Sequence, residues 1–137
     1  MLENENKIKK VVKKYDLKMV LLFGSRVSGR INFDSDVDIA YLSGRELSGK
    51  EIINLNCDFI DIFNCDKIDM VDLKRVNPFL RYEISRNSKL LFGNEIDYLK
   101  FKAFAFRSYI DHQPLFKLQD ILLKRRHELL RKSIYGK

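Results

Sequence analysis

The residue pattern with the clearest chemical meaning is a pair of aspartates, Asp36 and Asp38, in the segment DVDIAYL. The alternation of this segment predicts a strand, and side chains two positions apart on a strand point to the same face. Two such carboxylates repel each other by roughly 4 kcal/mol at about 4 Å and an effective dielectric of about 20, and a cation between them removes this penalty. Oxygen ligands without a histidine suit Mg²⁺, which also favours carboxylates combined with substrate phosphates.

A glycine–serine turn precedes this pair and has the properties of a phosphate-binding loop. Gly24 and Ser25 follow the apolar run KMVLLF at residues 18–23, which reads as a buried strand. A glycine lets phosphates approach the backbone, and the amides after it can hold an anion. The Ser25 hydroxyl can donate one more hydrogen bond, and Arg26 can neutralise charge. A metal-binding face beside such a turn is what phosphoryl or nucleotidyl transfer requires.

A third carboxylate would let two metal ions sit about 3.5–4 Å apart, one at the attacking hydroxyl and one at the triphosphate. The segment KIDMVDL, residues 67–73, reads as a third strand and offers Asp69 and Asp72. Their spacing is odd, so they point to opposite faces, and only one of them can face Asp36 and Asp38. The spacing alone leaves both candidates open.

Several helices and strands are expected to position these residues. Apolar residues at helical spacing predict helices, and short apolar or alternating runs predict strands. Pro78 suits the first position of a short helix. In chain order, we expect a helix at about 4–15, strands at 18–23 and 36–42, a helix at about 50–63, a strand at 67–73, a short helix to about residue 85 and a small strand at 89–92.

The chain reads as helical from Glu95 to its end. Pro114 should end one helix or start the next. The first of these helices has two apolar faces, and a helix that is apolar on two sides usually lies between two surfaces. One of these surfaces would be this domain, and the other could be a partner chain. The two faces are Ile96, Leu99, Ala103, Phe106 and Ile110, and Tyr98, Phe101 and Phe104.

Charge is distributed unevenly along the chain, whose formal net charge is +7. Up to Tyr98 there are 16 basic and 16 acidic residues, whereas residues 99–137 contain 10 basic and 3 acidic residues. A basic segment attached to a neutral body indicates an anionic partner, either a protein surface or RNA. A solvated helix face rich in lysine and arginine is an equally good interpretation.

The segment GSRVSGRINFDSDVDIAYL resembles the signature of the DNA polymerase β-type nucleotidyltransferase superfamily, and the short chain is similar to the minimal nucleotidyltransferase (MNT) proteins. KIDMVDLKRVNPFLRYEISRNSKLLFG is similar to the same family. The resemblance implies an α+β fold of the nucleotidyltransferase type, with an αβαβαβ core, C-terminal helices, and a small mixed sheet of three or four strands with helices packed on one side. It places Gly24 and Ser25 at the triphosphate, and it suggests a phosphate contact for Arg26.

The same resemblance implies that Asp36, Asp38 and Asp69 are the catalytic and metal-binding carboxylates, with Asp72 as the alternative to Asp69. Two Mg²⁺ ions and ATP as the substrate follow from it. A mild departure from the family is Ala40-Tyr41, where a smaller aliphatic pair is commoner, and it leaves the metal face intact.

The family resemblance also implies a partner. Many MNT proteins are antitoxins encoded with a HEPN-domain RNase toxin, so we expect a hetero-oligomer in which AMP passes from ATP to a tyrosine hydroxyl of that toxin. The helices from Glu95 onward would be a docking element, and nucleic-acid binding through their basic residues is possible but not expected. The alternatives are a small-molecule nucleotidyltransferase of the aminoglycoside-modifying kind and a non-catalytic antitoxin that acts by binding.

Length and composition set the remaining expectations. A chain of 137 residues suits one domain, with a nucleotidyltransferase core at about residues 1–93 and a helical extension at about 94–137. No apolar run approaches the roughly 20 residues of a membrane span, and the N-terminus lacks the apolar region of a signal peptide. We therefore expect a cytoplasmic location.

Overall fold

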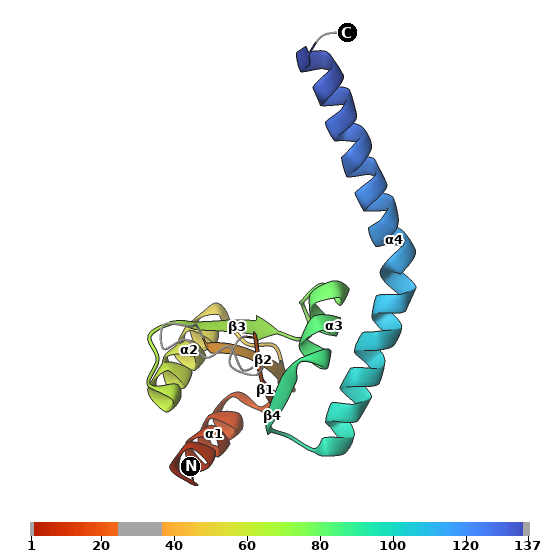
Figure 1. Cartoon of the computed structure of the whole chain (residues 1–137). Coiled ribbons are helices and arrows are strands. Elements are labelled where there is room, and N and C mark those ends of the chain that lie inside the picture. Colours follow the sequence, from red (N-terminus) through yellow and green to blue (C-terminus); the bar gives the residue numbers. More distant parts are fainter. Residues whose placement is uncertain (1, 25–36, 136–137) are drawn as a thin grey trace.

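The fold is a four-stranded mixed sheet with helices on both faces (Figure 1). The computed structural model describes residues 2–24 and 37–135. The strand order is β3-β2-β1-β4, in which β1 is antiparallel to β2 and to β4, and β2 is parallel to β3. The elements are α1 (Leu2–Tyr15), β1 (Leu17–Phe23), β2 (Val37–Ser43), α2 (Gly49–Phe63), β3 (Ile68–Asp72), α3 (Pro78–Arg86), β4 (Ser88–Phe92) and α4 (Glu95–Tyr135).

Helix α2 is the crossover that makes β2 and β3 parallel, because parallel neighbours cannot be joined by a tight turn. Its start is fixed by a capping box, in which the Ser48 hydroxyl accepts the Glu51 N–H and the Glu51 carboxylate accepts the Ser48 N–H. Its end is marked by Asn64 in the left-handed region, with φ 49°. These two signals set the length of the crossover and thereby help to fix where β3 begins.

Two hydrophobic clusters lie on opposite faces of the sheet. Helices α1 and α2 cover one face, where Tyr15 and Phe59 are buried against β1 and β2. Helices α3 and α4 cover the other face through Ile84 and Phe101. The expectation that helices pack on one side only is therefore wrong. The reason is that the central strands are apolar on both faces, as a strand buried on both sides must be.

Helix α4 runs without interruption from Glu95 to Tyr135, and Pro114 lies inside it. The expectation that Pro114 ends one helix and starts another is wrong. A proline inside a helix removes one backbone hydrogen bond and bends the axis, and α4 is visibly bent along its length (Figure 1). The leucines, lysines and arginines that follow are strong helix formers, so the helix resumes after the bend.

The remaining element predictions are confirmed to within about two residues at each end, the usual scatter of element boundaries. Asn77 caps α3 by accepting the Leu80 N–H, and Pro78 occupies the first turn as expected. Within residues 2–24 and 37–135, no helix has both the length and the apolar character needed to cross a bilayer.

Candidate active site

The end of β1 brings the chain backbone against the carboxylate of Asp38. Phe23, the last residue of β1, pairs with Asp38 on β2, and Gly24 follows with φ 84°. A β-carbon built on Gly24 would overlap the Oδ2 atom of Asp38. Both the left-handed backbone and the lack of space therefore require glycine at this position. The result is that the half-buried backbone of Gly24 lies next to the half-buried carboxylate of Asp38.

The parallel register of β2 and β3 sets Asp38 directly beside Asp69. Residues that pair across neighbouring strands point to the same face of the sheet. Both carboxylates therefore project from the face that α3 and α4 partly cover. Asp69 is exposed and Asp38 is half-buried. The pairing therefore creates a local concentration of negative charge next to the Gly24 backbone.

Asp72, the other candidate for a third carboxylate, lies on the opposite face of β3. It pairs in register with Tyr41, whose pKa is raised by burial and by the nearby charge of Asp72. The Asp72 Oδ1 atom accepts the backbone N–H of Lys74 at 2.9 Å, and its Oδ2 atom lies 3.9 Å from Arg75 Nε. Asp72 thus stabilises the turn after β3 and does not face Asp38.

Three of the predicted site residues, Ser25, Arg26 and Asp36, lie outside the described residues. Among the residues that the structure does describe, no three His, Cys, Asp or Glu side chains form a group able to hold a metal ion. The described part of the site thus consists of two carboxylates and the glycine backbone. These are oxygen donors only, and a hard cation such as Mg²⁺, which takes its other oxygens from phosphates and water, fits them.

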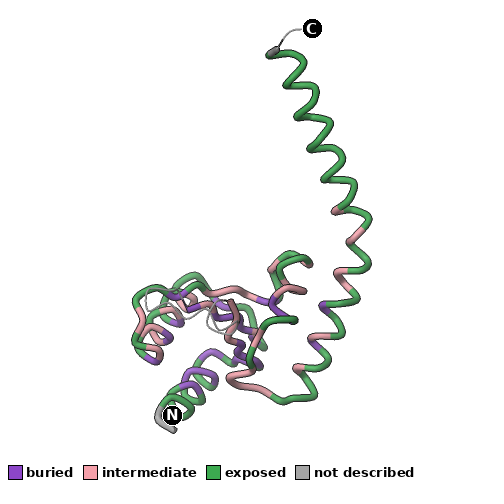
Figure 2. Tube along the Cα trace, in the orientation of Figure 1, coloured by how far each residue is buried: buried purple, intermediate pink, exposed green. Residues whose placement is uncertain are grey.

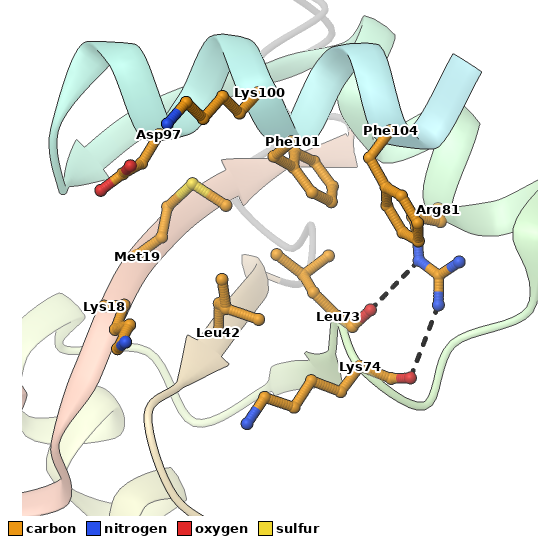
Figure 3. A pocket seen from close by; sticks show the side chains of 10 residues that line it. All are labelled: Lys18, Met19, Leu42, Leu73, Lys74, Arg81, Asp97, Lys100, Phe101 and Phe104. Atoms are coloured by element: carbon orange, nitrogen blue, oxygen red, sulfur yellow. Dashed lines mark hydrogen bonds between the residues drawn. The ribbon is translucent and has the colours of Figure 1, made fainter. Parts of the chain in front are cut away.

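A hollow lies on the same face of the sheet as Asp38 and Asp69, at the other end of the strands, between the sheet and α4 (Figure 3). Its volume is about 540 Å³, and its apolar floor includes Met19 and Leu73. The rim is cationic. Among the described residues, no carboxylate forms an ion pair with the ammonium groups of the rim lysines. The basic rim residues are Lys18, Lys74, Arg81 and Lys100, against a single carboxylate from Asp97.

Among the basic residues of the rim, Arg81 is held in place by contacts with the protein itself. Its Nε atom donates to the Leu73 carbonyl at 3.2 Å, and its guanidinium lies 5.2 Å from the centre of the Phe104 ring (Figure 3). Burial lowers the pKa of Arg81 from its usual value. Sequence reasoning missed this hollow, because its residues lie far apart in the sequence, between Lys18 and Phe104, and meet only through the fold. The only available signal was the basic character of the segment LKRVNPFLR.

Comparison with known proteins shows the family of this chain. The family model described as "Polymerase beta, Nucleotidyltransferase" matches residues 6–97, which include Gly24 and all four acidic candidates. A protein adenylyltransferase MntA of Aphanizomenon flos-aquae is 30% identical over 118 residues, covering 77% of this chain and 78% of that protein.

Two solved structures extend the similarity to the fold. A crystal structure of a toxin–antitoxin with AMP-PNP has a chain that is 27% identical, with a TM-score of 0.69 over 87% of this chain and 98% of that one. A structure of the tri-AMPylated Shewanella oneidensis HEPN toxin in complex with its MNT antitoxin has a chain that is 25% identical, with a TM-score of 0.64 over 88% of this chain and 98% of that one. By sequence and by fold, this chain belongs to the polymerase β nucleotidyltransferase family.

Proposed function

We propose that this chain is a protein adenylyltransferase and the antitoxin of a HEPN-domain toxin, and that it transfers AMP from ATP to a tyrosine hydroxyl of that toxin. The observation that carries the proposal is the meeting of Asp38, Asp69 and the Gly24 backbone at one end of one sheet face. A carboxylate pair beside a glycine turn suits a nucleoside triphosphate, because the turn can receive phosphates while the carboxylates hold the cations that accompany them.

Each residue has a defined part in the proposed reaction. Asp36, Asp38 and Asp69 would hold two Mg²⁺ ions, which lower the pKa of the acceptor hydroxyl and neutralise charge on the triphosphate when bound. Gly24 and Ser25 would bind the triphosphate through backbone amides and a hydroxyl, and Arg26 would contact a phosphate. The tyrosine oxygen forms a bond to the α-phosphorus, the bond to the bridging oxygen breaks, and pyrophosphate departs with that electron pair. The hydroxyl proton passes to one of the carboxylates.

The choice of partner and nucleotide is supported by the relatives. One similar structure contains AMP-PNP, and another contains an AMPylated HEPN toxin with its MNT antitoxin. One further feature suits a protein acceptor, because α4 presents a long exposed surface (Figure 2).

The test is AMP transfer to the HEPN-domain toxin that is proposed as the partner. The purified pair is incubated with ATP and MgCl₂, and the toxin is weighed by intact mass spectrometry. We expect a gain of one or more AMP units on a tyrosine, loss of transfer on chelation of Mg²⁺, and at least about a hundredfold slower transfer by Asp38→Asn. Asp61→Asn is the matched control, because Asp61 is an exposed aspartate on α2, which covers the opposite sheet face.

Two outcomes would contradict the proposal. An unchanged toxin mass alongside tight binding would indicate an antitoxin that acts by binding alone. Equal transfer by Asp38→Asn and the unsubstituted protein would mean that these carboxylates do not carry the reaction.

A further inference from the structure

The hollow between the sheet and α4, which we call the cationic hollow, is separate from the carboxylates of the proposed active site (Figure 3). Asp38 and Leu42 lie on the same face of β2, and four residues at about 3.3 Å each place them about 13 Å apart. Between them, Ala40 is completely buried, in the same cluster as Ala105 of α4. Packed side chains therefore separate the two places, and a small molecule in one does not extend into the other.

The cationic hollow has the size and the lining of a small-molecule site. Its volume of about 540 Å³ lies within the range of roughly 300–1,000 Å³ that is usual for ligand pockets. Leu42, on the sheet side, is half-buried, and Phe104, on α4, is 56% exposed, so both present apolar surface to the hollow. A ligand with an apolar body would remove this surface from water, which favours binding.

Three lysines from three separate elements surround this apolar surface. Lys18 lies on β1, Lys74 follows β3, and Lys100 lies on α4. All three are exposed, and no carboxylate of the described residues forms an ion pair with them. Among the residues that line the hollow, Asp97 supplies the one carboxylate. Ammonium groups gathered in this way repel each other, and an anion between them would remove the repulsion.

We propose that the cationic hollow binds a small molecule that carries a phosphate group on an apolar body. Lysine binds phosphate as a point charge. A phosphate monoester has nearly two negative charges near pH 7 and three terminal oxygens, so it suits three lysines better than a carboxylate does. Arg81 is not counted among these cations, because its guanidinium already contacts the Leu73 carbonyl and the Phe104 ring.

The first experiment tests the class of ligand by calorimetry on the full chain. EDTA is present, because it removes the divalent cations that a phosphate would need beside Asp38. The probes are 1-naphthyl phosphate and octyl phosphate, which carry the same phosphate on an aromatic and on an alkyl body. We expect saturable binding of at least one probe, at least about tenfold tighter than that of inorganic phosphate or 1-naphthol, each of which lacks half of the ligand. The probe that binds more tightly identifies the kind of body.

The second experiment locates the bound phosphate with charge reversals. Lys74→Glu and Lys100→Glu alter the cationic hollow. Lys117→Glu and Lys132→Glu make the same change in net charge at exposed positions farther along α4. The first pair should bind the tighter probe at least about tenfold more weakly, the loss expected of one charge-assisted hydrogen bond, and the control pair should change its affinity less than about threefold. All four lysines are exposed, so thermal unfolding without the probe should stay the same.

The third experiment locates the apolar body. Phe104→Ala removes apolar surface from the cationic hollow, whereas Phe106→Ala removes a ring that is 53% exposed on the same helix and does not line the hollow. We expect about fivefold weaker binding of the tighter probe to Phe104→Ala and unchanged binding to Phe106→Ala.

Four outcomes would overturn the inference. The first is the absence of saturable binding of either probe. The second is equal loss of binding in the hollow variants and in their charge-matched controls, which would indicate attraction by net charge alone. The third is binding that Asp38→Asn abolishes and the hollow variants keep, which would place the probe at the carboxylates. The fourth is equally tight binding of inorganic phosphate. None of these outcomes bears on the proposed AMP transfer, which the mass of the toxin tests separately.

Discussion

The backbone of Gly24 lies against the carboxylate of Asp38, so close that no β-carbon fits between them. This contact joins the end of β1 to the carboxylate that β2 presents, and it explains why a glycine stands where the turn begins. The contact also allows a direct test of the proposed site, because the methyl group of an alanine at position 24 would displace Asp38.

Gly24→Ala should abolish most AMP transfer and weaken the fold. The alanine must adopt φ 84° and its methyl group must displace Asp38, so we expect a loss of about 1–3 kcal/mol in the free energy of unfolding. Thermal unfolding and the transfer rate are measured together. Gly49→Ala is the control, because a β-carbon at Gly49 meets nothing within 4 Å. Full activity in Gly24→Ala would show that the Gly24–Asp38 contact has no part in nucleotide binding.

Asp69→Ala and Asp72→Ala should have opposite effects on activity and stability. Asp69 stands beside Asp38 and is exposed, so its loss should slow transfer by at least about a hundredfold with little effect on unfolding. Asp72 holds the turn after β3 through the Lys74 N–H, so its substitution should lower stability by about 1 kcal/mol and spare transfer. The two variants are compared by transfer rate and urea unfolding. The reverse pattern would assign the third carboxylate to Asp72.

The sequence predicted the order of the elements and the aspartate-rich strand, because both depend on local patterns. Asp38 lies on β2 as the alternation predicted, whereas Asp36 lies outside the described residues, so its place beside Asp38 stays a prediction. The choice between Asp69 and Asp72 could not be read in this way. It depends on the parallel register of β2 and β3, which is set by the length of the α2 crossover and not by β3 alone.

One feature of α4 escaped prediction for a different reason. Pro114 usually marks a boundary, but the helix formers after it outweigh the one lost hydrogen bond. The two apolar faces of the first half of α4 were expected to lie between this domain and a partner chain. Phe101, on one face, packs on the domain, and Leu99 and Phe106, on the other face, are exposed. The contact with the domain is confirmed, and the contact with a partner chain stays a prediction.

Glu51→Gln should reduce stability in a pH-dependent way. The Arg45 guanidinium, in a hydrogen bond at 3.1 Å, and the Ser48 backbone N–H lower the pKa of Glu51 from 4.5 to about 2. A carboxyl with a depressed pKa contributes stability at a pH above its unfolded value, and this contribution is lost as the pH falls through its folded value. Glutamine can keep the capping hydrogen bond but not the charge.

The unsubstituted protein should therefore be more stable than Glu51→Gln at pH 7. The difference should shrink as the pH falls below about 4.5 and vanish near 2. Thermal unfolding across this range measures it, with Glu5→Gln on α1 as the control. A difference that stays constant from pH 7 to pH 2 would mean that the Arg45 pair contributes nothing to stability.

Phe101→Ala should detach the first half of α4 from the sheet. Phe101 is 9% exposed and packs in the cluster that includes Met19 and Leu73, so truncating it should cost about 3 kcal/mol of unfolding free energy. Leu99→Ala is the matched control on the same turn of α4. Leu99 is 64% exposed, so its truncation should cost less than about 0.5 kcal/mol.

Hydrogen exchange separates local detachment of α4 from global loss of stability. If Phe101 anchors α4, the amides of residues 98–110 should lose protection in Phe101→Ala before those of β1 and β2 do. Uniform loss of protection across the sheet would mean that Phe101 supports the whole core instead. Equal effects of Phe101→Ala and Leu99→Ala would contradict the burial that sets these two side chains apart, and with it the conclusion that only one face of this half of α4 packs on the domain.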